Sequence, residues 1–355
     1  MLATEFIRLR LANQRLSVTT LSTPAQVVRW LGAAQAQEYG GAKWSLALRM
    51  QNGSDEVIEQ AFTAGEILRT HLMRPTWHFV PAEDIRWMLE LTAPRVHTVN
   101  GTMYRQHALD TETLVRSSAV LESALGGGRH LTRAELAAEL RRAGISADGV
   151  RLGYILHYAE LEGLICSGPR RGKQFTHALL AERAPQAQSL PREQALATLT
   201  RRFFSSHGPA TLKDFSWWSG LTMADARIGL EIARSDLLSE EIDGLVYWRP
   251  AASPDVEPPS PYAYLLQPYD EYTIAYRHYW PVFDPDHRQQ ILAAAFYGII
   301  ILDGRLVGNW GRTIKGKQTL IKTALFRPLS EPETAALQAA AARFGDFVGM
   351  EAVLV

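Results

Sequence analysis

The chain repeats one order of elements three times: a helix, a turn, a second helix, and then two short strands around a polar turn. The clearest copy begins at Thr132, which can cap a helix together with Glu135 three residues later. Gly144 is suited to end that helix, and apolar residues at helical spacing over 150–161 predict a second one. Two strands are expected around the basic turn 168–172. A helix-turn-helix followed by a hairpin is the pattern of a winged-helix domain.

The third copy lies further along the chain. A helix is expected over 192–207 and ends at Gly208, and Thr211 can cap a second helix together with Asp214. A further helix follows, and then two strands that turn at Asp243-Gly244, a favoured hairpin dipeptide.

The first copy is less regular. Thr23 and Pro24 are typical of a helix start, and the apolar pattern predicts one helix over 24–37, ended by Gly40-Gly41. The other elements expected here are a helix at 54–64, two strands around Met73–Pro75, and a helix at 82–92.

A Pro- and Ser-rich stretch at 249–261 is the best domain boundary in the chain. After it the pattern changes to alternating strands, one helix and a closing strand, which indicates a β-rich or α+β terminal domain. The predicted fold class is therefore α+β, with three tandem winged-helix modules followed by a β-rich domain. The expected domains are 1–105, 106–185, 186–252 and 253–355.

Composition narrows the class of protein. The 355 residues hold 37 basic and 37 acidic side chains, so the chain is no polycation, and one cysteine excludes a disulfide framework or a Cys-rich zinc site. No apolar run is long enough to span a bilayer, and a reducing cytoplasm is the expected compartment. Six basic residues and no acid lie between Asp303 and Glu331, and 1–52 holds six basic and two acidic residues. Two basic ends suggest a side that faces a polyanion, although ordinary surface variation gives the same pattern.

Five stretches resemble landmarks of one family, the bacterial tandem winged-helix proteins that include the AlkZ-type DNA glycosylases. The most specific is Gln35-Ala36-Gln37, which is similar to the Gln-apolar-Gln catalytic motif of that family, with an unusually small middle residue. The others are RTHLMRPTWHFV (69–80), SSHGPATLKDFSWWSGL (205–221), YDEYTIAYR (269–277) and ILDGRLVGNWGR (301–312).

The resemblance implies three winged helices and a terminal β-rich domain in a C-shaped arrangement that embraces DNA. It implies hydrolysis of the N-glycosidic bond of alkylated purines, including bulky adducts and interstrand crosslinks, with Gln35 and Gln37 as the catalytic residues. Glutamine has no useful basicity, but its amide can hold a water. A purine alkylated at N7 is cationic and leaves as a neutral base, so positioning the water suffices. No cofactor is expected.

The spacing of the two glutamines constrains their setting. On a continuous helix, positions 35 and 37 point about 200° apart, so both cannot face one substrate. The helix is therefore expected to end there, with Gln35 in its last turn. The nearest carboxylate, Glu38, reads as a surface residue. Asp270 and Glu271 are alternative carboxylates, which could hold a water or pair with an arginine as a structural strut; the strut is favoured.

Several basic residues are candidates for contact with DNA phosphates. They are Arg312, Lys315 and Lys317 in the hairpin expected at 306–321, Arg170, Arg171 and Lys173 in the middle wing, and Arg74 and His78 in the first. The alternative for the hairpin and wing residues is that they lie in solvent without contacting DNA. The alternative for His78, and for His71 beside it, is that they are packed in the interior. Residues 311–317 fit a phosphate-loop frame, but Gln318 replaces the Ser or Thr that would bind Mg²⁺. Trp217 and Trp218 are expected in the core, as is Cys166, and no metal motif is present.

Two functions remain open from the sequence. The favoured one is a monomeric, monofunctional DNA glycosylase that acts on N7-alkylated purines in double-stranded DNA and associates with the bacterial nucleoid. The alternative is a non-enzymatic winged-helix DNA-binding protein, either a regulator or a lesion binder. No heptad pattern or evident dimer helix favours the regulator.

Overall fold

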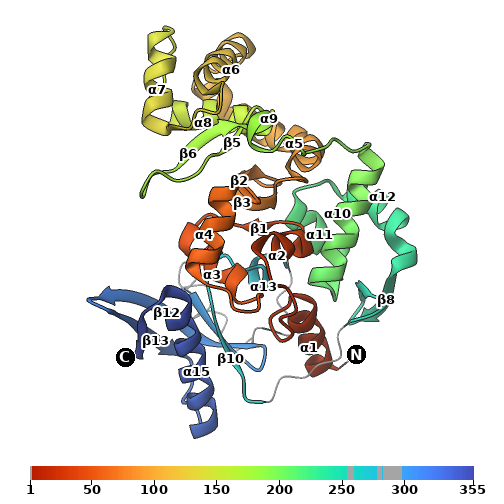
Figure 1. The fold of residues 1–355 in the computed structure, drawn as a ribbon. Coiled ribbons are helices and arrows are strands. Elements are labelled where there is room, and N and C mark those ends of the chain that lie inside the picture. Colours follow the sequence, from red (N-terminus) through yellow and green to blue (C-terminus); the bar gives the residue numbers. More distant parts are fainter. Residues whose placement is uncertain (1, 254–259, 278–281, 283–297) are drawn as a thin grey trace.

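The computed structural model describes residues 2–253, 260–277, 282 and 298–355, and Figure 1 shows how their helices and strands are arranged. The first copy of the repeated pattern ends in a three-stranded antiparallel sheet of order β1-β3-β2. Its elements are α1 (Ala3–Asn13), α2 (Pro24–Leu31), β1 (Ala34–Gln35), α3 (Tyr39–Ala47), α4 (Asp55–Ala64), β2 (Ile67–Leu72), β3 (Thr76–Pro81) and α5 (Ile85–Gln106).

The predicted helix over 24–37 is wrong in its second half. Thr23 and Gln26 form a capping box that begins α2, but the helix stops at Leu31 because Gly32 takes a φ of 88°, which lies outside the helical region. The chain then runs extended into β1, and Gly40-Gly41 lie in the first turn of α3 instead of ending a helix.

The middle copy follows the sequence closely. Thr132 and Glu135 form the expected capping box, and the sheet has the order β4-β6-β5. Its elements are α6 (Thr111–Leu125), β4 (Leu131–Thr132), α7 (Arg133–Arg142), α8 (Gly149–Leu161), β5 (Ile165–Ser167), β6 (Thr176–Leu179) and α9 (Leu180–Arg183).

The third copy repeats that arrangement with the sheet order β7-β9-β8. Thr211 and Asp214 form a capping box, and the hairpin turns at Asp243-Gly244, as expected. The elements are α10 (Arg192–His207), β7 (Ala210–Thr211), α11 (Leu212–Ser219), α12 (Met223–Ala233), the 3₁₀ turn η1 (Arg234–Asp236), β8 (Leu237–Ile242) and β9 (Leu245–Pro250). The boundary predicted at 249–261 falls partly outside the described residues.

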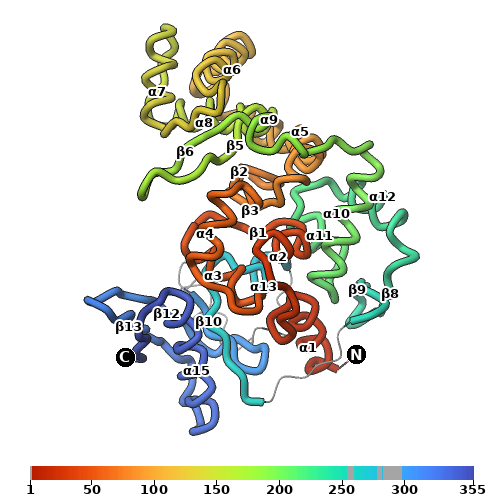
Figure 2. Tube along the Cα trace, in the orientation of Figure 1, coloured from red at the N-terminus to blue at the C-terminus, as the bar shows by residue number. Residues whose placement is uncertain are grey.

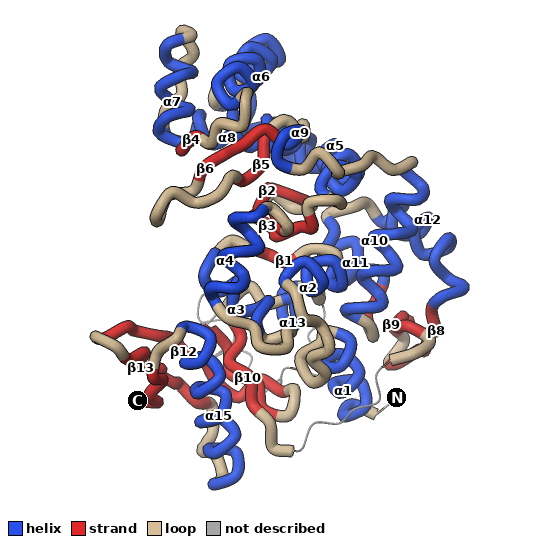
Figure 3. Tube along the Cα trace, in the orientation of Figure 1, coloured by secondary structure: helices blue, strands red, loops and turns tan. Residues whose placement is uncertain are grey.

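The C-terminal part is a five-stranded sheet of order β10-β11-β12-β13-β14, with only β13 and β14 parallel. Its elements are β10 (Ala263–Leu266), α13 (Glu271–Ile274), β11 (Gly298–Leu302), β12 (Arg305–Lys315), β13 (Gln318–Leu325), α15 (Glu331–Val348) and β14 (Glu351–Leu354). Figure 3 shows α15 beside this sheet, against which it buries Phe344.

The buried cores join these parts instead of separating them. One cluster combines apolar residues of α2, α3 and α4 with β10, β11 and α15, and a second combines β2 and α5 with α10, α11 and α12. The middle copy has its own cluster. In the view of Figure 2, the turn between β5 and β6 and the turn between β12 and β13 project toward the same side, beyond α3 and α4.

Candidate active site

The two glutamines lie on an extended segment. Gln35 pairs with His78 in the ladder between β1 and β3, and the Ala36 N–H continues that ladder by donating to the carbonyl of Trp77 at 2.7 Å. Side chains alternate along an extended chain, so a strand that continued from β1 would carry positions 35 and 37 on one face. β1 itself ends at Gln35, Ala36 is buried in the core, and Gln37 lies in the bend that follows. Because Gln35 lies in a short strand and not in a helix, the angle of about 200° that a helix would place between positions 35 and 37 does not apply.

The backbone of the motif is anchored from both sides. The Gln35 N–H donates to Glu271 Oε1 at 2.8 Å, and the Arg69 guanidinium donates to the carbonyl of Ala36 at 2.9 Å and to that of Gln37 at 3.5 Å. These contacts fix the main chain and leave the amide groups of the side chains to other partners.

The side chains themselves differ in exposure. Gln35 is buried and its Oε1 accepts a hydrogen bond from Arg74 at 3.1 Å, whereas Gln37 is exposed and its Oε1 accepts from the Trp77 N–H at 3.4 Å. Within the described ranges, neither glutamine NH₂ group has a hydrogen-bond acceptor. Each amide can therefore still donate to a water or a substrate oxygen.

Glu271 is buried and contacts several parts of the chain, so it is not a base that faces solvent. Besides Gln35, it accepts from Trp218 Nε1 at 2.8 Å and lies 3.3 Å from His207 Nε2. Burial alone would raise its pKa, but the bond and charge of His207 and the Gln35 N–H outweigh burial and hold the pKa below its usual value. Glu271 stays ionised with both oxygens occupied, which favours a structural role.

Asp270 is the strut that the sequence suggested. Arg49 donates to its two oxygens at 2.9 and 2.7 Å, and Ser45 donates to it at 2.6 Å. Both members of the ion pair are fully buried. The pair ties α3 and the turn after it to the start of α13.

The basic residues predicted to contact DNA are placed unequally. Lys315 and Lys317 are exposed at the turn between β12 and β13, and Arg312 is exposed lower on β12, next to Gly40 and so to the segment after Gln37. Arg312 also lines a small pocket of about 200 Å³ with Glu38, whose carboxylate caps α3. One arm of the hairpin therefore adjoins the glutamine motif.

The candidates in the two wings are mostly engaged. Arg170 pairs with Glu59 at 3.3 Å and Arg171 with Glu135 at 2.8 Å, while Lys173 is exposed. His78 lies in β3, the central strand of the first sheet, and is only 1% exposed, so it has no access to a phosphate in this structure. Its burial argues against the predicted contact between His78 and DNA.

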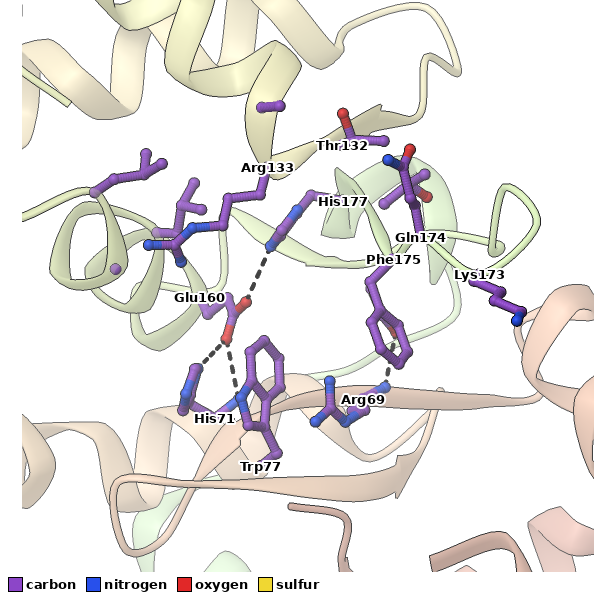
Figure 4. A pocket seen from close by; sticks show the side chains of 16 residues that line it. Arg69, His71, Trp77, Thr132, Arg133, Glu160, Lys173, Gln174, Phe175 and His177 are labelled. Carbon is purple, nitrogen blue, oxygen red and sulfur yellow. Dashed lines mark hydrogen bonds and ion pairs between the residues drawn. The ribbon is translucent and has the colours of Figure 1, made fainter. Parts of the chain in front are cut away.

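A pocket of about 570 Å³ lies between β2–β3 and the middle copy, and Figure 4 shows its side chains. Buried Glu160 lies 2.6 Å from His71 Nδ1 and 3.6 Å from His177 Nε2. Burial would raise the pKa of Glu160, but these two histidines outweigh it and hold the pKa well below the usual value. The group joins β2 to α8 and β6, and its other walls, Arg69 and Trp77, are the residues that contact the motif.

Two buried histidines should make the fold sensitive to acid. Burial and the charge of Arg74 lower the pKa of His78 to about 4, and burial and His71 lower that of His157 to about 3. Between pH of about 6.5 and about 4, the unfolded chain binds protons that the folded chain refuses, so stability falls as the pH falls. We expect a loss of about 1.4 kcal/mol per pH unit for each histidine, measured by urea unfolding at several pH values.

The variants His78→Gln and His157→Asn provide the control for this expectation. Each should flatten the dependence of unfolding free energy on pH by removing one titrating group. Equal wild-type stability at pH 7 and pH 5 would contradict the expectation.

Other sequence expectations have mixed outcomes. Trp218 is in the core, but Trp217 is 46% exposed, so its predicted burial is wrong. Cys166 is buried, which raises the pKa of its thiol to about 12 and makes it unreactive. The described residues contain no group of three or more His, Cys, Asp or Glu side chains that could hold a metal ion. No described helix is long and apolar enough to cross a membrane.

Comparison with known proteins identifies the class. Residues 28–347 match the family model described as "DNA glycosylase AlkZ-like", so the protein is placed among DNA glycosylases, the hydrolases that cleave the N-glycosyl bond between a base and its sugar. Within that class, the chain belongs to the AlkZ-like DNA glycosylase family. The resemblance inferred from the sequence is thereby confirmed.

Two comparisons find similarity to proteins named from Streptomyces sahachiroi. A protein named interstrand DNA cross-link repair glycosylase is 25% identical over 338 residues, which is 85% of each chain. The solved structure of S. sahachiroi DNA glycosylase AlkZ superposes with a TM-score of 0.81 at 22% identity and covers 99% of both chains. The second comparison shows a shared mixed α+β fold along the whole chain.

Proposed function

We propose that the protein hydrolyses the N-glycosidic bond of N7-alkylated purines in double-stranded DNA, including bulky or crosslinked adducts. The observation that carries the proposal is that Gln35 ends the short strand β1 and Gln37 follows it on a backbone anchored by Glu271 and Arg69, with both amide NH₂ groups unengaged among the described residues. The family and the name of the S. sahachiroi relative support the substrate class.

The chemistry fits neutral side chains. Glycosidic cleavage passes through an oxocarbenium-like state, and a cationic N7-alkylated purine leaves without protonation. Two glutamine amides then hold the attacking water at the anomeric carbon, and such positioning can account for several orders of magnitude in rate. The nearby carboxylates of Asp270 and Glu271 are occupied by Arg49, His207 and Trp218, which favours the glutamines as the water ligands.

The architecture proposed for this activity is three winged-helix modules, at 1–105, 106–185 and 186–252, and a β-rich domain at 253–355, in a C-shaped monomer. Its support is the shared strand order of the three small sheets. The projection of two hairpin turns to one side also fits a groove that holds a duplex.

The direct test is incubation with duplex DNA that carries N7-methylguanine or an N7-linked crosslink, followed by alkali to reveal abasic sites. Strand breaks at the modified purine are expected. DNA binding without any base release would favour the alternative, a non-enzymatic lesion binder or regulator.

The enzyme should be monofunctional, because the part of the chain that the structure describes has no lysine near the motif that is suited to attack the sugar. A lyase needs an accessible lysine with a depressed pKa. Lys43 is only 4% exposed and its Nζ lies 2.8 Å from both Asp55 and Glu59. We expect no enzyme–DNA adduct after borohydride treatment, and an adduct that disappears in Lys43→Ala would contradict this.

The hairpin turn should contribute phosphate contacts that do not read bases. Replacing both Lys315 and Lys317 with alanine should weaken binding to damaged and undamaged duplex by similar factors. The slope of log affinity against log salt should fall by up to about 1.8, at about 0.9 for each lost phosphate contact. An unchanged slope would show that the turn faces solvent.

A further inference from the structure

A second pocket, of about 520 Å³, lies where the turn between β2 and β3 meets α5, α11 and α12. We call it the cationic hollow, because its described lining includes five basic side chains and no acidic one. The basic residues are Arg74, Arg95, Lys213, Arg227 and Arg277. They come from separate parts of the sequence, and no single stretch shows the concentration.

Four of these side chains are both exposed and without a countercharge. Arg95, Lys213, Arg227 and Arg277 are exposed, and no salt bridge joins any of them to a residue in the described ranges. Positive charges gathered in a concave wall repel one another and concentrate anions from solution. In the middle wing, by contrast, Arg170 and Arg171 are neutralised by Glu59 and Glu135. The unpaired positive charges of the hollow therefore favour the binding of an anionic ligand.

An exposed aromatic ring stands among these charges. Trp217 is 46% exposed, and its Nε1 donates to the carbonyl of Ile274 at 3.1 Å, which fixes the orientation of the indole. The Arg74 guanidinium lies 5.1 Å from the ring centroid. Cations beside an aromatic face suit a nucleotide, because the cations can bind phosphates while the ring packs on a sugar or base.

Arg74 connects the hollow to the glutamine motif. It lines the hollow and donates to Gln35 Oε1 at 3.1 Å. We infer that the cationic hollow binds backbone phosphates of the DNA strand that carries the damaged base; the reference to the damaged strand rests on the proposed function. Phosphate contacts set the register of DNA on a protein without reading its sequence. The hollow thus positions the target nucleotide relative to Gln35.

The test measures binding to undamaged duplex, which does not depend on base excision. The double variant Lys213→Ala/Arg227→Ala should lower the slope of log affinity against log salt by up to about 1.8. Over a fourfold rise in salt, that difference corresponds to about 12-fold in relative affinity. The matched control, Arg105→Ala/Arg116→Ala, removes two exposed charges, from the end of α5 and from α6, that no salt bridge joins to a residue in the described ranges, and it should leave the slope nearly unchanged.

A second variant separates stacking from charge. Trp217→Ala should weaken binding without changing the salt slope, and Trp217→Phe should retain most of the affinity. Thermal unfolding of every variant checks that it is folded.

Two outcomes would overturn the inference: an unchanged slope in Lys213→Ala/Arg227→Ala, or an equal fall in the matched control. A wild-type protein that releases no base but shows the expected slopes would refute the proposed function and leave the phosphate site standing.

Discussion

Replacing Gln35 or Gln37 with alanine should lower the rate of base excision by about one to three orders of magnitude, at about 1.4 kcal/mol for each tenfold. Each substitution removes one of the two amides that would hold the attacking water. The measurement is single-turnover excision of N7-methylguanine from duplex DNA at saturating enzyme. DNA affinity should change little, because the Gln35 N–H keeps its bond to Glu271 and the Arg69 contacts are to backbone carbonyls.

Gln51→Ala is a matched control, since this exposed glutamine lies in the turn between α3 and α4, in the same copy of the repeat but outside the motif. It should excise at the wild-type rate. A Gln35→Ala/Gln37→Ala double variant as active as the wild type would remove the glutamines from the mechanism and promote Asp270 or Glu271 as the next candidates.

Breaking the Arg49–Asp270 pair should have the largest effect on stability. Asp270→Asn or Arg49→Met leaves one charge fully buried without its partner, which costs about 3–5 kcal/mol. The Arg49 guanidinium also donates to Gln14 at 2.9 Å, so the loss spreads from α13 to the segment after α1. Urea unfolding monitored by tryptophan fluorescence measures the change.

Arg142→Ala breaks an exposed ion pair with Glu139 and should change the unfolding free energy by less than about 0.5 kcal/mol. The combined variant Arg49→Met/Asp270→Leu should regain part of the stability, because no unpaired charge remains. A cost in Asp270→Asn no greater than that of Arg142→Ala would show that the pair contributes little.

The sequence predicted helix starts well where the contacts that set them join residues close together in the chain. The capping boxes at Thr132 and Thr211 each involve residues three positions apart, and both helices begin where the sequence indicates. The helix over 24–37 failed because its end depends on distant partners. Gly32 leaves the helical region, and the two residues of β1 pair with β3, which the chain supplies about forty residues later, while the Gln35 N–H donates to the still more distant Glu271.

In the candidate site, too, features set by neighbouring residues could be predicted and features set by tertiary packing could not. The identity of the motif could be proposed from its letters, and an arginine partner for a carboxylate at 270 or 271 was expected as a type of contact. No spacing rule could name Arg49 as that partner, or Glu271 as the acceptor of the Gln35 N–H, because tertiary packing brings them together. The cationic hollow was likewise invisible, since Arg95, Lys213 and Arg227 each look like an ordinary solvated helix residue.

The bond between Gln35 and Glu271 joins residues 236 positions apart, and this separation has a consequence for synthesis of the protein. At about 5–20 residues per second, a ribosome adds the acceptor about 10–50 s after it has added the motif. During that interval the Gln35 N–H lacks its carboxylate, and the carboxylate of Asp270 has not yet reached Arg49. The nascent N-terminal half therefore cannot form these two contacts by itself. The glutamine motif reaches its final anchored geometry only after residues 270 and 271, in the last third of the chain, have left the ribosome.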